Sequence, residues 1–178
     1  MKTLVSLTAL LFLLVNVATH AASKQEIDVY VDEALVEFKN YTLAGTKLAA
    51  KSRGMLVFPK VYKAGIGIGG EYGEGALRIG DQNVAYYSTA AASIGFQLGA
   101  QRKAQVILFM TDDALNKFRN SEGWEAGVDG SVAIASLGAG DSIDTNTAQQ
   151  PIIGFIFSNE GLMFNLTLEG SKFTKIVR

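Results

Sequence analysis

The hydrophobic residues in the first third of the chain recur at helical spacing. Apolar positions between residues 24 and 39 fall three or four apart, which places them on one helical face: Ile27, Tyr30, Val31, Ala34, Leu35 and Phe38. Ser23 and Glu26 match the S-x-x-E pattern of a capping box, so we expect the helix to begin directly after Ser23. A second helical segment is expected between residues 42 and 52, with Gly54 as its stop.

After Gly54 the spacing of apolar residues changes from helical to alternating, which is typical of strands. The expected strands are 55–58, 64–69, 73–80, 84–88, 90–98, 104–110, 127–137, 152–158, 161–169 and 172–177. One helix interrupts them after Thr111, whose hydroxyl suits an N-cap. The pattern predicts an α+β fold in which the N-terminal amphipathic helix covers a curved, mostly antiparallel, glycine-rich sheet. The sheet is expected to be barrel-like or a sandwich, with one short internal helix.

The segment 65–70 contains Gly-Ile-Gly-Ile-Gly-Gly, which matches the G-x-G-x-x-G pattern of nucleotide-binding loops. A dinucleotide site needs a helix directly after these glycines, yet Glu71-Tyr-Gly-Glu-Gly follows, and glycine disfavours a helix. The glycines at 65, 67, 69, 73 and 75 share one face of a strand, since alternate residues point the same way. We therefore expect a bare strand face that permits close packing, with the N-terminal helix as its covering neighbour.

The first 22 residues resemble a secretory signal peptide. Lys2 precedes an apolar run from Leu4 to Val17 that is too short to span a bilayer, and small residues follow it. We expect cleavage after Ala21 or Ala22, and export to the periplasm or cell envelope if the source is bacterial. Residues 23–178 are then long enough for a single domain.

The composition of the expected mature chain narrows its chemistry. The chain has no cysteine and a single histidine, His20, which cleavage would remove. Zinc sites and catalytic triads that use histidine are therefore disfavoured, and we expect no cofactor and no bound metal. The chain has 16 basic and 17 acidic residues, and loss of Lys2 leaves a net charge of −2. This balance does not favour nucleic acid as a partner.

Four blocks of the sequence resemble the SYLF domain family in its bacterial exported form. They are GMLVFPKVYKAGIGIGGEYGEGAL, AYYSTAAASIGFQLGAQ, ILFMTDDALNKFRNSEGWEAGVDGSVAIASLGAG and PIIGFIFSNEGLMFNLTLEGSKFTKI, and the likeness extends from about Ala34 to Ile176. In eukaryotes this family is known for phosphoinositide binding and, in fungal members, for actin bundling. The resemblance implies a non-enzymatic domain that binds phospholipid. If the chain is exported, affinity for anionic lipid is the part of the family's function that we expect it to share.

A basic segment provides the candidate lipid contact. Basic residues flank the apolar strand 55–58 within a stretch of thirteen residues that contains no acid, and an aromatic residue lies beside them. A basic pair in an expected turn adds to the patch. The predicted site consists of Lys51, Arg53, Lys60, Tyr62, Lys63, Arg102 and Lys103. The alternative is a solvated rim around a buried strand, with the basic pair as a solubilising hairpin tip.

Other interpretations remain open at this point. The acidic polar face of segment 24–39 favours a core-packing helix over a membrane-bound one. Trp124 is expected in the core or rim rather than in a headgroup layer. The pairs Asp112-Asp113 and Glu71/Glu74 give little support to a carboxylate hydrolase, and the segment 141–146 lacks the spacing of a calcium loop. A structural or protein-binding module of the cell envelope is the second hypothesis.

Overall fold

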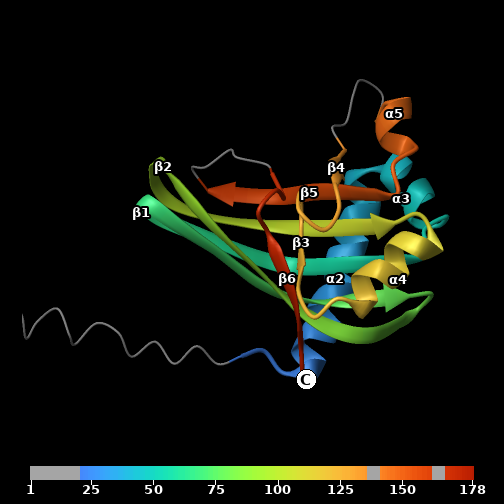
Figure 1. The fold of residues 1–178 in the computed structure, drawn as a ribbon, viewed down its shortest axis with the longest axis horizontal. Coiled ribbons are helices and arrows are strands. Elements are labelled where there is room, and N and C mark those ends of the chain that lie inside the picture. The colour runs from blue at the N-terminus through green and yellow to red at the C-terminus, as the bar shows by residue number, and fades with distance from the viewer. Residues whose placement is uncertain (1–20, 136–140, 162–166) are drawn as a thin grey trace, which may run out of the picture.

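The computed structural model describes residues 21–135, 141–161 and 167–178 (Figure 1). The expected leader, apart from its last two residues, lies outside this part of the chain, as do residues 136–137 and 162–166 of the expected strands. Four helices are described: α2 (Lys24–Tyr41), α3 (Leu43–Ala49), α4 (Asp112–Asn120) and α5 (Thr145–Ala148). The described strands are β1 (Gly54–Ile79), β2 (Gln82–Phe109), β3 (Trp124–Glu125), β4 (Ala133–Ile134), β5 (Ile152–Gly161) and β6 (Lys172–Ile176).

One long hairpin forms most of the sheet. β1 and β2 pair antiparallel from Gly54 and Phe109 at the open end to Ile79 and Gln82 at the turn. The turn is closed at Gly80, whose φ of 61° lies in the left-handed region that glycine adopts without strain. Six expected strands are therefore joined into two, and the expected turn at Arg102-Lys103 is wrong because both residues lie within β2.

The hairpin bends back on itself near its middle. The register shifts between Ile66 and Ile68, and Figure 1 shows both strands turning at one edge of the molecule and running back. We call the parts of each strand before and after this bend its first and second limbs. The two limbs of β1 meet at glycines. A Cβ at Gly73 would lie 2.7 Å from the Lys60 carbonyl oxygen, and a Cβ at Gly75 would lie under 3.0 Å from the Val57 carbonyl oxygen. Close packing of backbone at these glycines is confirmed. The covering neighbour is the other limb of β1 rather than the N-terminal helix.

The remaining strands extend the curl into a half-barrel. β6 pairs with the first limb of β2, β5 pairs with the second limb, β4 runs parallel to β5, and β3 pairs with β6. All of these pairs except β4–β5 are antiparallel. The expected α+β fold with a curved, mostly antiparallel sheet is confirmed.

Alternation along the strands gives the sheet two buried faces. On the inner face, Phe58 of β1 stacks on Phe173 of β6 at 5.5 Å, and α4 contributes Phe118. On the outer face, Val57, Val106 and Phe155 pack against α2. The apolar face of α2 is buried, as the sequence predicts for a core-packing helix: Ile27, Val31, Ala34 and Phe38. Each sheet face thus has its own helical cover.

The capping residues in the sequence correctly predict where α2 and α4 begin. The capping box of Ser23 and Glu26 is present at the start of α2, and Thr111 caps α4 through Ala114 N. The strand expected over 127–137 is mostly wrong, since within 127–135 only Ala133–Ile134 forms a strand and Gly130 makes an isolated bridge to Ala126. The sequence pattern does not predict α5. Trp124 lies in the inner core, where it is 4% exposed, which confirms the core interpretation.

Candidate functional site

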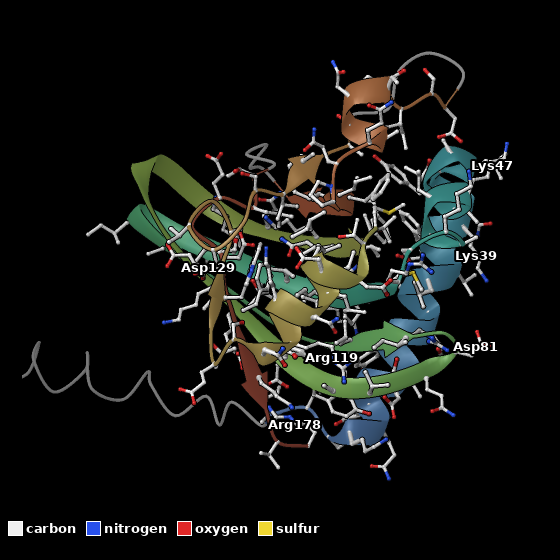
Figure 2. The ribbon with its side chains drawn as sticks, turned by 45° about the vertical axis from the view of Figure 1, so that its right-hand side comes forward. Lys39, Lys47, Asp81, Arg119, Asp129 and Arg178 are labelled. Atoms are coloured by element: carbon white, nitrogen blue, oxygen red, sulfur yellow. The ribbon has the colours of Figure 1, made fainter. Side chains whose placement is uncertain are left out.

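The junction of α2 and α3 presents a row of basic side chains. Lys39 lies in the last turn of α2, Leu43 begins α3, Lys47 lies one turn later, and Lys51 follows the end of α3. Leu43 and Lys47 lie one turn apart and share one side of α3, whereas Thr42, whose backbone is extended, separates them from Lys39. Figure 2 shows Lys39 and Lys47 on the same outer side of the molecule. We call Lys39, Leu43, Lys47 and Lys51 the corner row.

A distant carboxylate holds α3 in place. Thr42 caps the helix by accepting a hydrogen bond from Gly45 N at 2.9 Å. Asp141, 98 residues from Leu43, accepts hydrogen bonds from Leu43 N at 2.6 Å and Ala44 N at 3.1 Å. The pKa of Asp141 lies below its ordinary value because the Thr42 side chain and these two amides hydrogen-bond to its charged form. The charged carboxylate therefore stabilises the start of α3.

The corner row has the chemistry of a contact with an anionic surface. Leu43 is 68% exposed, and none of the three lysines forms an ion pair with a described residue. Arg53 lies just beyond the row, with Nε 3.5 Å from Asp112 Oδ2 in an exposed pair that solvent screens. Lys47 interacts with the charge of Asp141 without forming an ion pair. Exposed ammonium groups near an exposed aliphatic side chain can face phosphate groups and acyl chains together.

The structure divides the predicted lipid site into three parts. Lys51 and Arg53 lie near the corner row. Lys60 and Tyr62 lie on β1, seven and nine residues after Arg53, which corresponds to about 23 and about 30 Å of extended chain. The single basic patch expected between residues 51 and 63 is therefore not formed.

The second part is an aromatic surface near the bend of the hairpin. Lys60 Nζ lies 3.2 Å from the centre of the Tyr30 ring, in a cation–π contact with α2. Tyr62 is exposed, together with Ile68 and Tyr72 on the second limb of β1. Arg102 is half-buried and has an interaction of its own. This surface has exposed apolar area but fewer available cations than the corner row.

The third part is buried, which corrects the prediction for two residues. Lys63 is 5% exposed and Lys103 is 1% exposed, because the side chains at 61, 63, 101, 103 and 105 point to the inner face. Lys103 Nζ lies 2.9 Å from Glu71 Oε2, and Gln105 Nε2 donates to Glu71 Oε1 at 3.1 Å. Neither lysine can reach a membrane surface in this conformation.

The acidic residues considered as catalytic or calcium-binding candidates have structural partners. Glu71 faces inward, whereas Glu74 binds Arg178 and accepts from the Tyr72 hydroxyl, so these two carboxylates do not share a site. Asp113 pairs with Lys117 along α4, and Asp144 caps α5. Within the described ranges, no group of three His, Cys, Asp or Glu side chains is arranged to hold a metal ion.

Sequence reasoning missed Lys39 and Lys47, although the spacing 39, 43, 47, 51 was visible. Thr42 separates the two predicted helices, and their spacing alone does not show that their outward faces lie on one side of the molecule. No described helix is both long and apolar enough to cross a bilayer.

The fold is a half-barrel, and the corner row gives its described part a basic surface with one exposed apolar side chain. These features are typical of a binding domain. Residues 90–176 match the family model described as "Ysc84: Las17-binding protein actin regulator". This part of the chain belongs to the SYLF domain family, whose members are generally binding modules rather than enzymes. The match begins in β2 and ends with β6, so it covers much of the sheet, and α2 and α3 precede it. No curated protein matches the chain.

Proposed function

We propose that the protein binds anionic phospholipid surfaces through the corner row, without catalysing a reaction. The observation that carries the proposal is the row itself: its three lysines form no ion pair with a described residue, and Leu43 in the same row is largely exposed. The family match supports a binding role, and its lipid-binding members make phospholipid the favoured partner.

The expected affinity is modest and depends on salt. Each lysine near an anionic membrane contributes about 1 kcal/mol, so three give about 3 kcal/mol, to which insertion of Leu43 adds. A total near 4 kcal/mol corresponds to a dissociation constant of about 1 mM. Such binding is tightest at low ionic strength on vesicles rich in anionic lipid and weakens as salt shortens the Debye length.

The proposal includes export. Residues 1–22 have the basic start, short apolar run and small residues of a secretory leader, and cleavage would leave the domain facing envelope lipids. The partner is then the anionic phospholipid of an envelope membrane. Detection of the tagged protein in the periplasmic fraction would support this placement, and recovery in the cytoplasm would contradict it.

Co-sedimentation with vesicles tests the lipid contact. The triple variant Lys39→Gln, Lys47→Gln, Lys51→Gln should lose most binding to phosphatidylglycerol vesicles, and wild-type binding should fall as salt rises. A matched control removes three exposed lysines elsewhere: Lys117→Gln, Lys172→Gln and Lys175→Gln. Equal binding by the two triple variants would show that net charge, not the corner row, determines the affinity.

A protein partner is the second candidate. The family model is named for a protein that binds Las17 and regulates actin, which favours a polypeptide partner for some members. An exported chain would meet a different protein, and the corner row would then face an acidic surface of that partner. This candidate would be favoured if the wild-type protein did not bind anionic vesicles but bound a specific envelope protein through the corner row.

A further inference from the structure

The outward side of α2 presents two apolar side chains to solvent. Val29 is 54% exposed and Val36 is 58% exposed, although the opposite face of the same helix is buried on the sheet. The two valines are seven residues apart, so they lie on one side of the helix, two turns from each other. Figure 2 shows α2 and α3 following one another along one side of the molecule. The valines therefore form a short apolar line on an outer helix.

Charged side chains of opposite sign accompany the valines. Asp32 follows Val29 by three residues and Lys39 follows Val36 by three, so both charges lie on the same flank of the line. The Asp32 side chain pairs with Arg78 yet remains 65% exposed, and Lys39 is exposed and forms no ion pair with a described residue. We call Val29, Asp32, Val36 and Lys39 the α2 seam.

The surface beside the seam is hollowed. A cavity of about 590 Å³ lies between α2, α3 and the turn of the long hairpin, and Leu35, Val36 and Met55 are among the residues that line it. Side chains of a partner would have room to pack there. The apolar area available for contact thus extends beyond the two exposed valines.

We infer that the α2 seams of two copies of the chain pack antiparallel, across a two-fold axis close to Val36. This arrangement places Asp32 of each copy opposite Lys39 of the other, and the contact occurs twice because a two-fold interface is self-complementary. Parallel packing would instead place Asp32 beside Asp32 and Lys39 beside Lys39, and like charges repel. The order of the charges along the seam therefore selects the antiparallel dimer.

A second copy fits the seam better than a membrane does. Asp32 and Glu33 flank Val29 on both sides, and these carboxylates would face the headgroups of an anionic lipid surface. In the dimer, Lys39 of the other copy neutralises the charge of Asp32. Lys39 also belongs to the corner row, so dimer formation and vesicle binding should compete for it. The dimer itself does not depend on the proposed function, because it is measured without lipid.

Sedimentation of the purified protein at increasing concentration tests the association. The wild type should change from monomer to dimer, and added salt should shift it back toward monomer because exposed ion pairs are screened. Val36→Glu places two like charges at the axis and should weaken association about tenfold or more. Val128→Glu is the matched control, since Val128 is 73% exposed outside the helices, and it should leave association unchanged.

Charge reversal tests the antiparallel register. Lys39→Glu alone and Asp32→Lys alone should each weaken association, because each creates like-charge contacts across the axis. An equal mixture of these two variants should associate about as well as the wild type, since every contact across the axis is again between opposite charges. Mere damage to the structure of either variant cannot produce this recovery. A mixture that associates no better than the separate variants would contradict the register and overturn the proposal.

A disulfide provides a test that needs no charged variant. The chain has no cysteine, so Val36→Cys introduces its one thiol. A disulfide requires Cα atoms within about 7 Å, and a residue beside the two-fold axis meets this condition. Under mild oxidation, Val36→Cys should form covalent dimers much faster than the control Val128→Cys.

Three other results would overturn the proposal. The first is a wild type that stays monomeric at low salt up to millimolar concentration, including one whose α2 responds only to anionic vesicles. The second is a dimer that Val36→Glu does not weaken, provided that circular dichroism shows this variant to be folded. The third is equal cross-linking of Val36→Cys and Val128→Cys, which would decide the case if the charged variants failed to fold.

Discussion

Gly75 has no side chain at a point where two limbs of one strand meet. Any β-carbon there would overlap the Val57 carbonyl oxygen, and the Phe58 ring lies within 3.0 Å as well. Overpacking of a core costs about 1–3 kcal/mol, and a backbone carbonyl yields less readily than a side chain. Gly75→Ala should therefore lower the free energy of unfolding by about 3 kcal/mol, measured by urea denaturation.

Gly70 provides the matched control for this prediction. It lies in the same strand, and a Cβ there would meet no atom within 4 Å. Gly70→Ala should leave stability unchanged or raise it slightly, because alanine reduces the entropy of the unfolded chain. If the two substitutions had equal effects, the close approach of the two limbs at Gly75 would not limit packing.

At the scale of elements, α3 depends on a residue far away in sequence. Asp141 accepts from the first two amides of α3, and its φ of 57° shows that the chain adopts an uncommon conformation to present this carboxylate. Asp141→Ala should loosen the start of α3, and with it Leu43 and Lys47 of the corner row. Faster amide exchange at Leu43 and Ala44 and weaker vesicle binding are the expected results.

This contact also has a defined pH dependence. Because the folded-state pKa of Asp141 is lowered, its stabilising contribution is present above the unfolded pKa and is lost as pH falls through the folded value. The amide shifts of Leu43 and Ala44 should therefore change below pH about 4. Asp141→Asn, which keeps an acceptor without a charge, should remove this titration; an unchanged titration curve would assign it to another group.

Elements whose signals are local were predicted well from the sequence. Capping residues and apolar spacing determine α2 and α4, and both depend on contacts within a few residues. The sequence pattern predicts several short strands in place of the long hairpin, because glycines and polar residues usually mark turns. Here Lys103 and Gln105 alternate with buried apolar residues instead, and their inward direction depends on Glu71, more than thirty residues earlier.

The candidate site was predictable to a similar extent. Lys51 and Arg53 were identified from local charge, and the four-residue spacing of the corner row was available in the same segment. Lys63 and Lys103 were assigned to the surface because a lysine in an isolated sequence is expected in solvent. Only the fold-back of the hairpin, which brings Glu71 to Lys103, reveals that they are buried.

At the scale of the whole molecule, the two ends of the described domain meet. Ala22 N donates to Glu74 Oε2 at 3.2 Å, and Arg178 at the C-terminus pairs with the other oxygen of Glu74. Figure 2 shows Arg178 beside the start of α2. The Tyr72 hydroxyl donates to Glu74 at 2.8 Å, and partial desolvation of this half-exposed side chain, together with the carboxylate, raises the pKa of Tyr72 to about 12. Glu74 therefore links both termini to β1.

This arrangement distinguishes the two expected cleavage positions of the leader. Cleavage after Ala21 would create an ammonium group at Ala22, beside the largely buried carboxylate of Glu74. Cleavage after Ala22 would place the new charge at Ser23, next to the positive end of the α2 dipole, which disfavours a cation. A protein that begins at Ala22 should be more stable than one that begins at Ser23 by about 1 kcal/mol.

The pH dependence of this difference identifies its cause. A carboxylate beside a new Ala22 amino group should favour its charged form, so the added stability should be present below the ordinary amino pKa of about 8 and be lost as pH rises above it. Thermal unfolding of the two proteins between pH 6 and pH 10, run with and without Glu74→Gln, measures it. Glu74→Gln should shrink the difference at pH 6, leaving only the part that comes from packing of the Ala22 methyl group against the outer core. A difference that persists unchanged in Glu74→Gln would mean that the amino group does not interact with this carboxylate.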